Sequence, residues 1–151
     1  MLVGDGPARP EIESQIAELG ISDNVRVLGR RNDVPRIMTA SDVFLFPSFH
    51  EGLPVVSLEA CACQLPLVGS RIPGTTESIV DGETGFLHDV EDESSMAASV
   101  LRLLNEPETA ERIRRAANDR IEKYFSRSAS ASSLKQLYAN VVIQQRRRRS
   151  A

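Results

Sequence analysis

Short apolar runs alternate with amphipathic segments along residues 1–88. A short apolar run predicts a buried strand, and apolar residues spaced by three or four positions predict a helix. We predict strands at residues 2–3, 25–28, 43–46, 67–68 and 85–87, and helices at residues 11–19, 35–39, 54–63 and 75–80. This alternation favours an α/β fold with a doubly wound, parallel, Rossmann-like sheet that has helices on both faces.

From Glu93 onward the sequence is rich in helix formers. We predict helices at residues 94–104 and 107–124, a serine-rich separator at residues 126–133, and a last helix with an apolar face. The expected organisation is one domain over residues 1–125 and a C-terminal helix with a basic tail over residues 126–151. The arginines at residues 146–149 leave two interpretations open, a solvated frayed end, which we favour, and a peripheral contact with a membrane.

Composition narrows the class of protein. The chain has 151 residues, of which 41% are apolar, and this suits a single compact domain. The formal net charge of −3 argues against nucleic-acid binding, because phosphate-backbone contacts need clustered positive charge. Cys61 and Cys63 point to different sides of a helix, so we expect buried thiols in a reducing compartment and no disulfide or metal site.

No apolar run in the sequence reaches the length of a membrane span, and no secretory signal is recognisable. We therefore expect a cytoplasmic protein, with the inner face of the membrane as the alternative location.

Two glutamates flank the start of the helix predicted at residues 54–63. Glu51 precedes it and Glu59 lies within it, in the spacing Glu51-x7-Glu59. Pro54 is suited to the first helical position, where a missing N–H is no loss. The positive end of the helix dipole and the free N–H groups would then form an anion site. Those N–H groups belong to Leu53, Val55 and Val56.

The helical position of Glu59 adds a second requirement. Val55, Glu59 and Cys63 fall on one stripe, so we expect Glu59 to project among apolar side chains, where a carboxylate needs hydrogen-bond donors. A ribose diol supplies two donors, and a nucleotide sugar presents a diphosphate together with hydroxyl groups. The simpler alternative is that Glu59 is half exposed and that Glu51 only complements the helix dipole.

A longer segment carries a family resemblance. Residues 41–87, SDVFLFPSFHEGLPVVSLEACACQLPLVGSRIPGTTESIVDGETGFL, resemble the C-terminal donor-binding domain of GT-B glycosyltransferases of the group 1 type, the retaining family 4. The resemblance continues upstream through LVGDGP and LGISDNVRVLGRRNDVP and covers roughly residues 1–104. Glu51-x7-Glu59 corresponds to the E-x7-E motif of that family.

The resemblance implies a division of labour at this site. Glu51 approaches the hydroxyl groups of the donor sugar and is the candidate catalytic residue, in a positioning and not a nucleophilic role. Glu59 binds the ribose, and the backbone N–H groups of Gly52, Leu53 and Val55 bind the diphosphate. Transfer would retain the anomeric configuration, with the leaving phosphate accepting the proton of the acceptor.

The resemblance also implies parts that this chain lacks. A first strand-helix unit would carry an Arg and a Lys that bind the phosphates, and an N-terminal domain would bind a glycan or lipid-linked acceptor. We therefore expect a fragment of a polysaccharide-biosynthesis enzyme that is inactive alone. No Asp-x-Asp motif is present, so we expect no metal and no cofactor, and a UDP-, GDP- or ADP-sugar as donor.

Other positions give weaker signals. Gly4 and Gly6 flank Asp5 in either a tight turn or the lining of the nucleotide cleft. Arg30 or Arg31 could contact the phosphate or the base of a nucleotide, although backbone groups of the loop could recognise the base equally well. Residues 74–77 resemble the family's Gly-x-Pro-Glu element, but Pro73 and Thr76 depart from it, so the conformation of this loop is left open. Gln64 follows the helix at a position where a left-handed cap is expected.

Two other classes of function are weighed against a glycosyltransferase. A non-catalytic nucleotide-sugar-binding module would share the same binding site and differ only in the turnover of the whole protein. A Rossmann oxidoreductase is disfavoured, because the chain lacks the G-x-G-x-x-G fingerprint and the ribose-binding acid that follows it.

Overall fold

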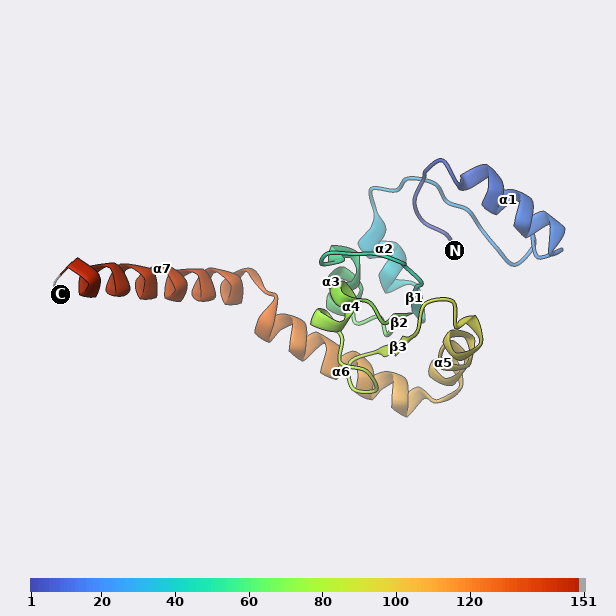
Figure 1. Ribbon diagram of the computed structural model, residues 1–151. Coiled ribbons are helices and arrows are strands. Elements are labelled where there is room, and N and C mark those ends of the chain that lie inside the picture. The colour runs from blue at the N-terminus through green and yellow to red at the C-terminus, as the bar shows by residue number, and fades with distance from the viewer. Residues whose placement is uncertain (150–151) are drawn as a thin grey trace. The chain divides into compact units, whose positions relative to one another are not determined.

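The computed structural model of the chain describes residues 1–149, including every side chain except those of residues 143, 144 and 146–149. The chain divides into two compact units, Met1–Ile37 and Met38–Ala151. Their boundary falls within the short helix α2 (Val34–Thr39), inside the region that the sequence predicts as one domain. Figure 1 shows the elements of both units coloured along the chain.

The first unit contains helix α1 (Arg9–Glu18) and a parallel bridge between Leu2 and Val27. Two backbone hydrogen bonds of 2.9 Å flank the bridge, from Leu2 N to Arg26 O and from Leu28 N to Leu2 O. The strands predicted at residues 2–3 and 25–28 therefore pair in the expected direction, but the pairing is limited to this single bridge.

Gly20 ends α1 in the way that its sequence position predicts. Its φ is 66°, in the left-handed region that glycine adopts without strain. Gly20 N donates to Ala17 O at 3.0 Å, and Ile21 N donates to Ile16 O at 3.1 Å. These two bonds satisfy carbonyl groups of the last helical turn in a Schellman arrangement.

The second unit is built on a parallel sheet of order β1-β2-β3, formed by β1 (Phe44–Phe46), β2 (Leu67–Ser70) and β3 (Phe86–His88). Phe44 is in register with Leu67, and Val68 with Phe86. The β1–β2 connection contains α3 (Val55–Ala62), and the β2–β3 connection contains α4 (Pro73–Ser78). Because all three strands are parallel, their carboxyl ends meet at one edge of the sheet.

Helices cover both faces of this sheet, which confirms the predicted fold class. On one face Leu67 and Leu87 pack with Cys61 of α3 and with the C-terminal half of α6 (Pro107–Tyr124). On the other face Val68 and Phe86 pack with α5 (Glu93–Asn105) and with the N-terminal half of α6. Figure 1 views the strands nearly end-on, with α3 on one side and α5 on the other.

Gln64 closes α3 in a left-handed conformation with a φ of 55°, which confirms the expected cap. Gln64 N donates to Cys61 O at 3.0 Å, and Leu65 N donates to Ala60 O at 2.9 Å. This is the same Schellman arrangement that ends α1, here with a side chain at the position that glycine prefers. A β-carbon in this region is strained by roughly 1 kcal/mol.

The serine-rich separator predicted at residues 126–133 is wrong, because helix α7 (Arg127–Arg149) runs through it. Ser126 lies just before this helix and its hydroxyl accepts a hydrogen bond of 3.2 Å from Ala129 N, so it acts as a helix cap. The side chains from Ser130 to Val142 are all exposed. The side chains of the basic tail at residues 146–149 lie outside the described residues.

Among the described helices, none is both long enough and apolar enough to cross a membrane.

Replacing Gln64 with glycine removes the strain at this cap, so Gln64→Gly should raise the free energy of unfolding by about 0.5–1 kcal/mol. Chemical denaturation with an unchanged m-value measures this gain. Ala98→Gly, at an exposed position within α5, is the matched control and should lower stability by about 1 kcal/mol. A loss of stability in Gln64→Gly would contradict the strain argument.

Candidate functional site

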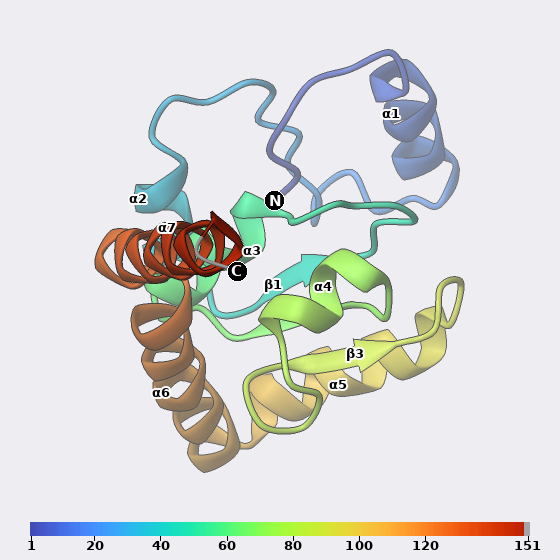
Figure 2. The same ribbon diagram turned by 60° about the vertical axis from the view of Figure 1, so that its left-hand side comes forward.

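The candidate site lies at the carboxyl edge of the sheet in the second unit. Strand β1 ends at Phe46, and the loop that follows leads directly into α3 at Val55. In open α/β sheets this edge is where ligands bind. Figure 2 shows the loop entering α3 with α4 nearby.

The first turn of α3 presents unpaired backbone donors. Pro54 is the N-cap, with φ −72° and ψ 100°, and not the first helical residue that the sequence suggested. Ser57 N bonds to Pro54 O at 3.0 Å. Within the described part of the chain, no acceptor faces the N–H groups of Gly52, Leu53, Val55 and Val56. These donors and the positive end of the helix dipole favour an anion at this position.

Glu51 lies in the loop just before these donors, and it is exposed. The hydroxyl of Ser48 donates to Glu51 Oε1 at 3.0 Å. This bond occupies one lone pair and leaves the remaining acceptor capacity of the carboxylate for a ligand.

Glu59 is exposed, so the expectation that it projects among apolar side chains is wrong. The buried stripe of α3 consists of Ser57, Ala60 and Cys61, while Val55 shares the exposed stripe with Glu59. Ser57 can be buried because its hydroxyl donates to Pro54 O at 2.7 Å. Among the described backbone and side-chain groups, no donor bonds to the Glu59 carboxylate, so its oxygens are available to hydroxyl groups of a ligand.

Helix α4 packs directly against the Glu51 loop. A β-carbon built at Gly74 would strike the carbonyl oxygen of Gly52 and lie 2.8 Å from that of Glu51. The hydroxyl of Thr75, which is fully buried, donates to the carbonyl oxygens of Ser70 at 2.5 Å and Ile72 at 2.9 Å. The element that resembles Gly-x-Pro-Glu, residues 74–77, therefore forms a closely packed, hydrogen-bonded turn despite its departures.

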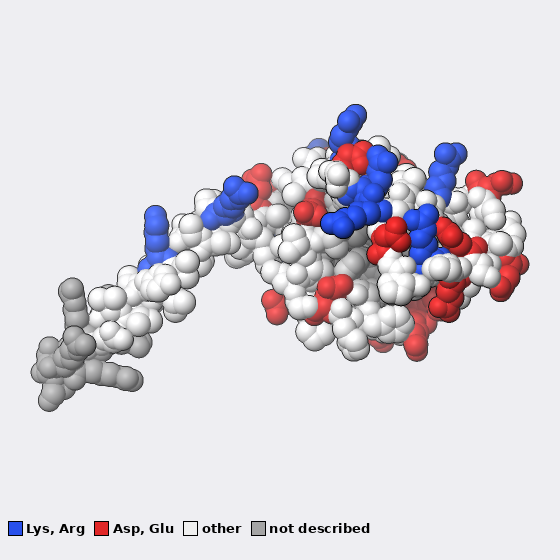
Figure 3. Space-filling model, turned by 90° about the horizontal axis from the view of Figure 1, so that it is seen from above, with Lys and Arg blue, Asp and Glu red and all other residues white. Residues whose placement is uncertain are grey.

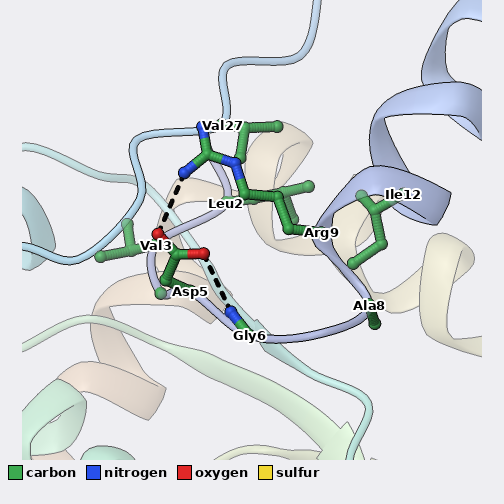
Figure 4. Close-up of a pocket in the computed structure, with 9 residues that line it drawn as sticks. Leu2, Val3, Asp5, Gly6, Ala8, Arg9, Ile12 and Val27 are labelled. Carbon is green, nitrogen blue, oxygen red and sulfur yellow. Dashed lines mark hydrogen bonds and ion pairs between the residues drawn. The ribbon is translucent and has the colours of Figure 1, made fainter.

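In the first unit, Gly4 and Gly6 belong to a turn that borders a pocket of about 330 Å³. Gly4 N donates to Gly29 O at 2.9 Å, and Gly6 N donates to Asp5 Oδ1 at 3.0 Å. Arg9 bonds to the other carboxylate oxygen of Asp5 at 3.1 Å (Figure 4). The turn and the pocket lining are thus both present, and nucleotide contacts by Gly4 and Gly6 stay a prediction.

The two neighbouring arginines of the first unit differ in their partners. Arg31 binds both carboxylate oxygens of Asp33 at 2.8 Å, and this hydrogen bonding raises the pKa of Arg31 and lowers that of Asp33. For Arg30, no acidic partner lies among the described residues, which leaves it as the free cation of the pair. On the face seen in Figure 3, basic side chains lie beside acidic ones.

An ion pair joins the segment after β2 to the β2–β3 connection and to β3. Arg71 bonds to Asp81 Oδ2 and to Leu87 O, both at 2.6 Å, and Leu87 N donates to Asp81 Oδ1 at 2.9 Å. Burial opposes ionisation of Asp81, but the hydrogen bonds from Arg71 and Leu87 outweigh it and lower the pKa of this carboxyl. The Cys61 thiol is free, and burial raises its pKa to about 12.

Sequence reasoning missed Ser48 and the role of Gly74. The signal for Gly74 was available, because a glycine inside a helical turn is unfavourable by about 1 kcal/mol and therefore has a packing reason. Ser48 gave only a signal that points elsewhere, because a serine three positions before a glutamate is the spacing of a helix capping box and no helix begins at Ser48.

Residues 1–120 match the family described as "Glycosyl transferases group 1". The chain belongs to this family. The family expected from Glu51-x7-Glu59 and its flanking sequence is therefore confirmed. One relative of this chain is N-acetyl-alpha-D-glucosaminyl L-malate synthase of Bacillus anthracis, which is 32% identical to it over 142 residues. That alignment covers 94% of the chain but only 37% of the relative.

Two solved structures share the fold of this chain. Sucrose-phosphate synthase from Thermosynechococcus elongatus superposes with a TM-score of 0.84 at 27% identity, over 95% of this chain and 38% of that one. HepE of Anabaena, in complex with UDP and glucose, gives a TM-score of 0.82 at 25% identity, over 91% of this chain and 40% of that one. The chain thus spans well under half the length of these relatives.

The lowered pKa of Asp81 makes the stability of the second unit depend on pH. A carboxyl whose pKa is lower when folded stabilises the protein above its unfolded pKa, near 3.9, and loses that effect as pH falls through the folded pKa. Asp81→Asn should therefore be less stable than the wild type at neutral pH, and this difference should shrink below about pH 4. Thermal unfolding at a series of pH values measures it. A difference that stayed constant to the lowest pH would contradict the ion-pair assignment.

Proposed function

We propose that this chain is the donor-binding part of a retaining glycosyltransferase, which transfers a sugar from a nucleoside diphosphate sugar to a glycan or lipid-linked acceptor. The whole enzyme would carry out the transfer, and the 151-residue chain alone would bind the donor without turnover.

The start of α3 carries this proposal. Unpaired N–H groups favour a diphosphate, while the exposed carboxylates of Glu51 and Glu59 keep free acceptor sites next to it. A carboxylate repels a neighbouring anion, so Glu51 and Glu59 would face hydroxyl groups of the ligand and not its phosphates. A ligand with a diphosphate between two polyols satisfies both conditions, and HepE, a structural relative, binds UDP and glucose.

The proposed chemistry is electrostatic. The N–H groups of Gly52, Leu53 and Val55 stabilise the charge that develops on the leaving diphosphate. Glu51 accepts hydrogen bonds from the donor sugar and orients its anomeric carbon. The acceptor attacks from the face that the diphosphate leaves, and the leaving phosphate takes the acceptor proton, so the configuration is retained.

We also propose a cytoplasmic location, supported by the buried Cys61 thiol, which is in no disulfide and suits a reducing compartment. A non-catalytic binding module is the alternative within the same family, and turnover of the full-length protein separates the two.

Calorimetric titration with UDP, GDP and ADP tests the donor site. We expect UDP to bind, and we expect Glu59→Ala to weaken it roughly 10- to 100-fold, because hydrogen bonds to a charged group contribute about 1.5–3 kcal/mol. Glu51→Ala should spare UDP and weaken only a UDP-sugar. Glu122→Ala, at an exposed position on α6, is the control and should change neither affinity. An unchanged UDP affinity in Glu59→Ala would refute the ribose contact.

We propose that donor binding needs no metal, because the sequence lacks an Asp-x-Asp motif at the diphosphate. The affinity for UDP should change by less than about twofold when Mg²⁺ is replaced by a chelator. This corresponds to a change of less than about 0.5 kcal/mol in the binding free energy. Titration in both buffers measures it. A tenfold loss with the chelator would mean that a cation completes the site.

A further inference from the structure

Gly74 occupies a position where only hydrogen fits. The β-carbon of any other residue would overlap the carbonyl oxygen of Gly52 and lie 3.0 Å from its carbonyl carbon. Gly74 has no positive φ, so the conformational freedom of glycine is not what requires it here. The requirement comes from the close approach of two backbone segments that are far apart in the chain.

Helix α4 cannot move away to relieve such a clash. Thr75 ties its first turn to β2 and to Ile72, as described above, and Ser78 contacts Ser57 of α3 with 3.5 Å between their hydroxyl oxygens. At the other end, Arg120 of α6 donates to Ser78 O at 2.8 Å and to Glu77 O at 2.9 Å. A side chain at position 74 must therefore displace the Glu51 loop.

The same contact sets the direction of the loop's donors. The carbonyl oxygens of Glu51 and Gly52 face Gly74. In a planar trans peptide the following N–H points the opposite way, so the N–H groups of Gly52 and Leu53 face away from α4. Both N–H groups lack an acceptor within the described residues, and both are therefore presented to a ligand.

The side chain of Glu51 has a separate restraint. Ser48 donates to Oε1 at 3.0 Å, so the side chain has a fixed partner before any ligand arrives. A polar group that is already oriented loses less freedom when it binds, which makes its contacts more effective. The main chain at Glu51 is thus restrained by Gly74, and the side chain by Ser48.

We propose that Gly74 and Ser48 are positioning residues that together orient Glu51 toward the sugar of the donor, while Gly74 also fixes the adjacent N–H groups that face the diphosphate. This inference rests on the proposed function, because it assigns these residues a role in selecting a sugar-bearing donor over the free nucleotide. Neither residue needs to touch the donor through its own side chain.

The test is the ratio of affinities for a UDP-sugar and for UDP, measured by calorimetry on the 151-residue chain. The probes are UDP-glucose, UDP-galactose and UDP-N-acetylglucosamine, and the sugar with the highest wild-type ratio is used. Gly74→Ala and Ser48→Ala should each lower that ratio about three- to tenfold. Ser48→Ala changes only a loop hydroxyl, so it keeps the test valid if Gly74→Ala folds poorly.

Gly85→Ala is the matched control. A β-carbon there would also be too close to its neighbours, at 2.8 Å from Ile79 Cγ2 and 3.0 Å from Leu67 O, but Gly85 lies before β3, at the opposite edge of the sheet. It should lower stability without changing the ratio. In a Glu51→Ala background, Gly74→Ala and Ser48→Ala should no longer change the ratio, because both act through Glu51.

Amide resonances of the ligand-free protein separate this inference from the proposed function. Gly74→Ala should shift the Gly52 and Leu53 amides, and Gly85→Ala should not. Shifted amides in a protein that binds no UDP would refute the proposed function while supporting the packing role of Gly74. Unshifted amides, an unchanged ratio in both variants, or an effect that persists without Glu51 would overturn the positioning role.

Discussion

The close packing of α3 and α4 through small residues is the constraint on which the site depends. Ser57 and Ser78 are fully buried, and each hydroxyl finds a partner in a nearby carbonyl group, so the two helices approach without leaving polar atoms unpaired. Gly74 continues this contact to the loop before α3. Larger side chains along this seam would separate the helices and move the unpaired N–H groups that precede α3.

Much of the fold could be predicted from local signals in the sequence. Gly20 ends α1 as expected, and Gln64 adopts the left-handed cap because two hydrogen bonds and the buried Leu65 hold it there. The parallel sheet follows from apolar runs that are buried on both faces, such as β2. In each case the residues that decide the structure are neighbours in sequence.

The errors came from choices that the local sequence leaves open. The stripe of Val55 and Glu59 is apolar enough to be buried, yet α3 buries Ser57 instead, because Pro54 O satisfies the serine hydroxyl. The serines after residue 126 predict a break, but a helix tolerates serine at these positions once Ser126 caps it. The contact between Gly74 and the Glu51 loop joins distant segments, so spacing alone does not reveal it.

The burial of Cys61 makes its thiol a probe of how often the packing of the second unit opens. Its thiol has no exposed surface and a pKa of about 12, so almost none of it is thiolate at neutral pH while the unit is closed. An alkylating reagent can modify it only when α3 detaches from the sheet. The rate of that modification therefore reports how often the layer beneath the candidate site opens.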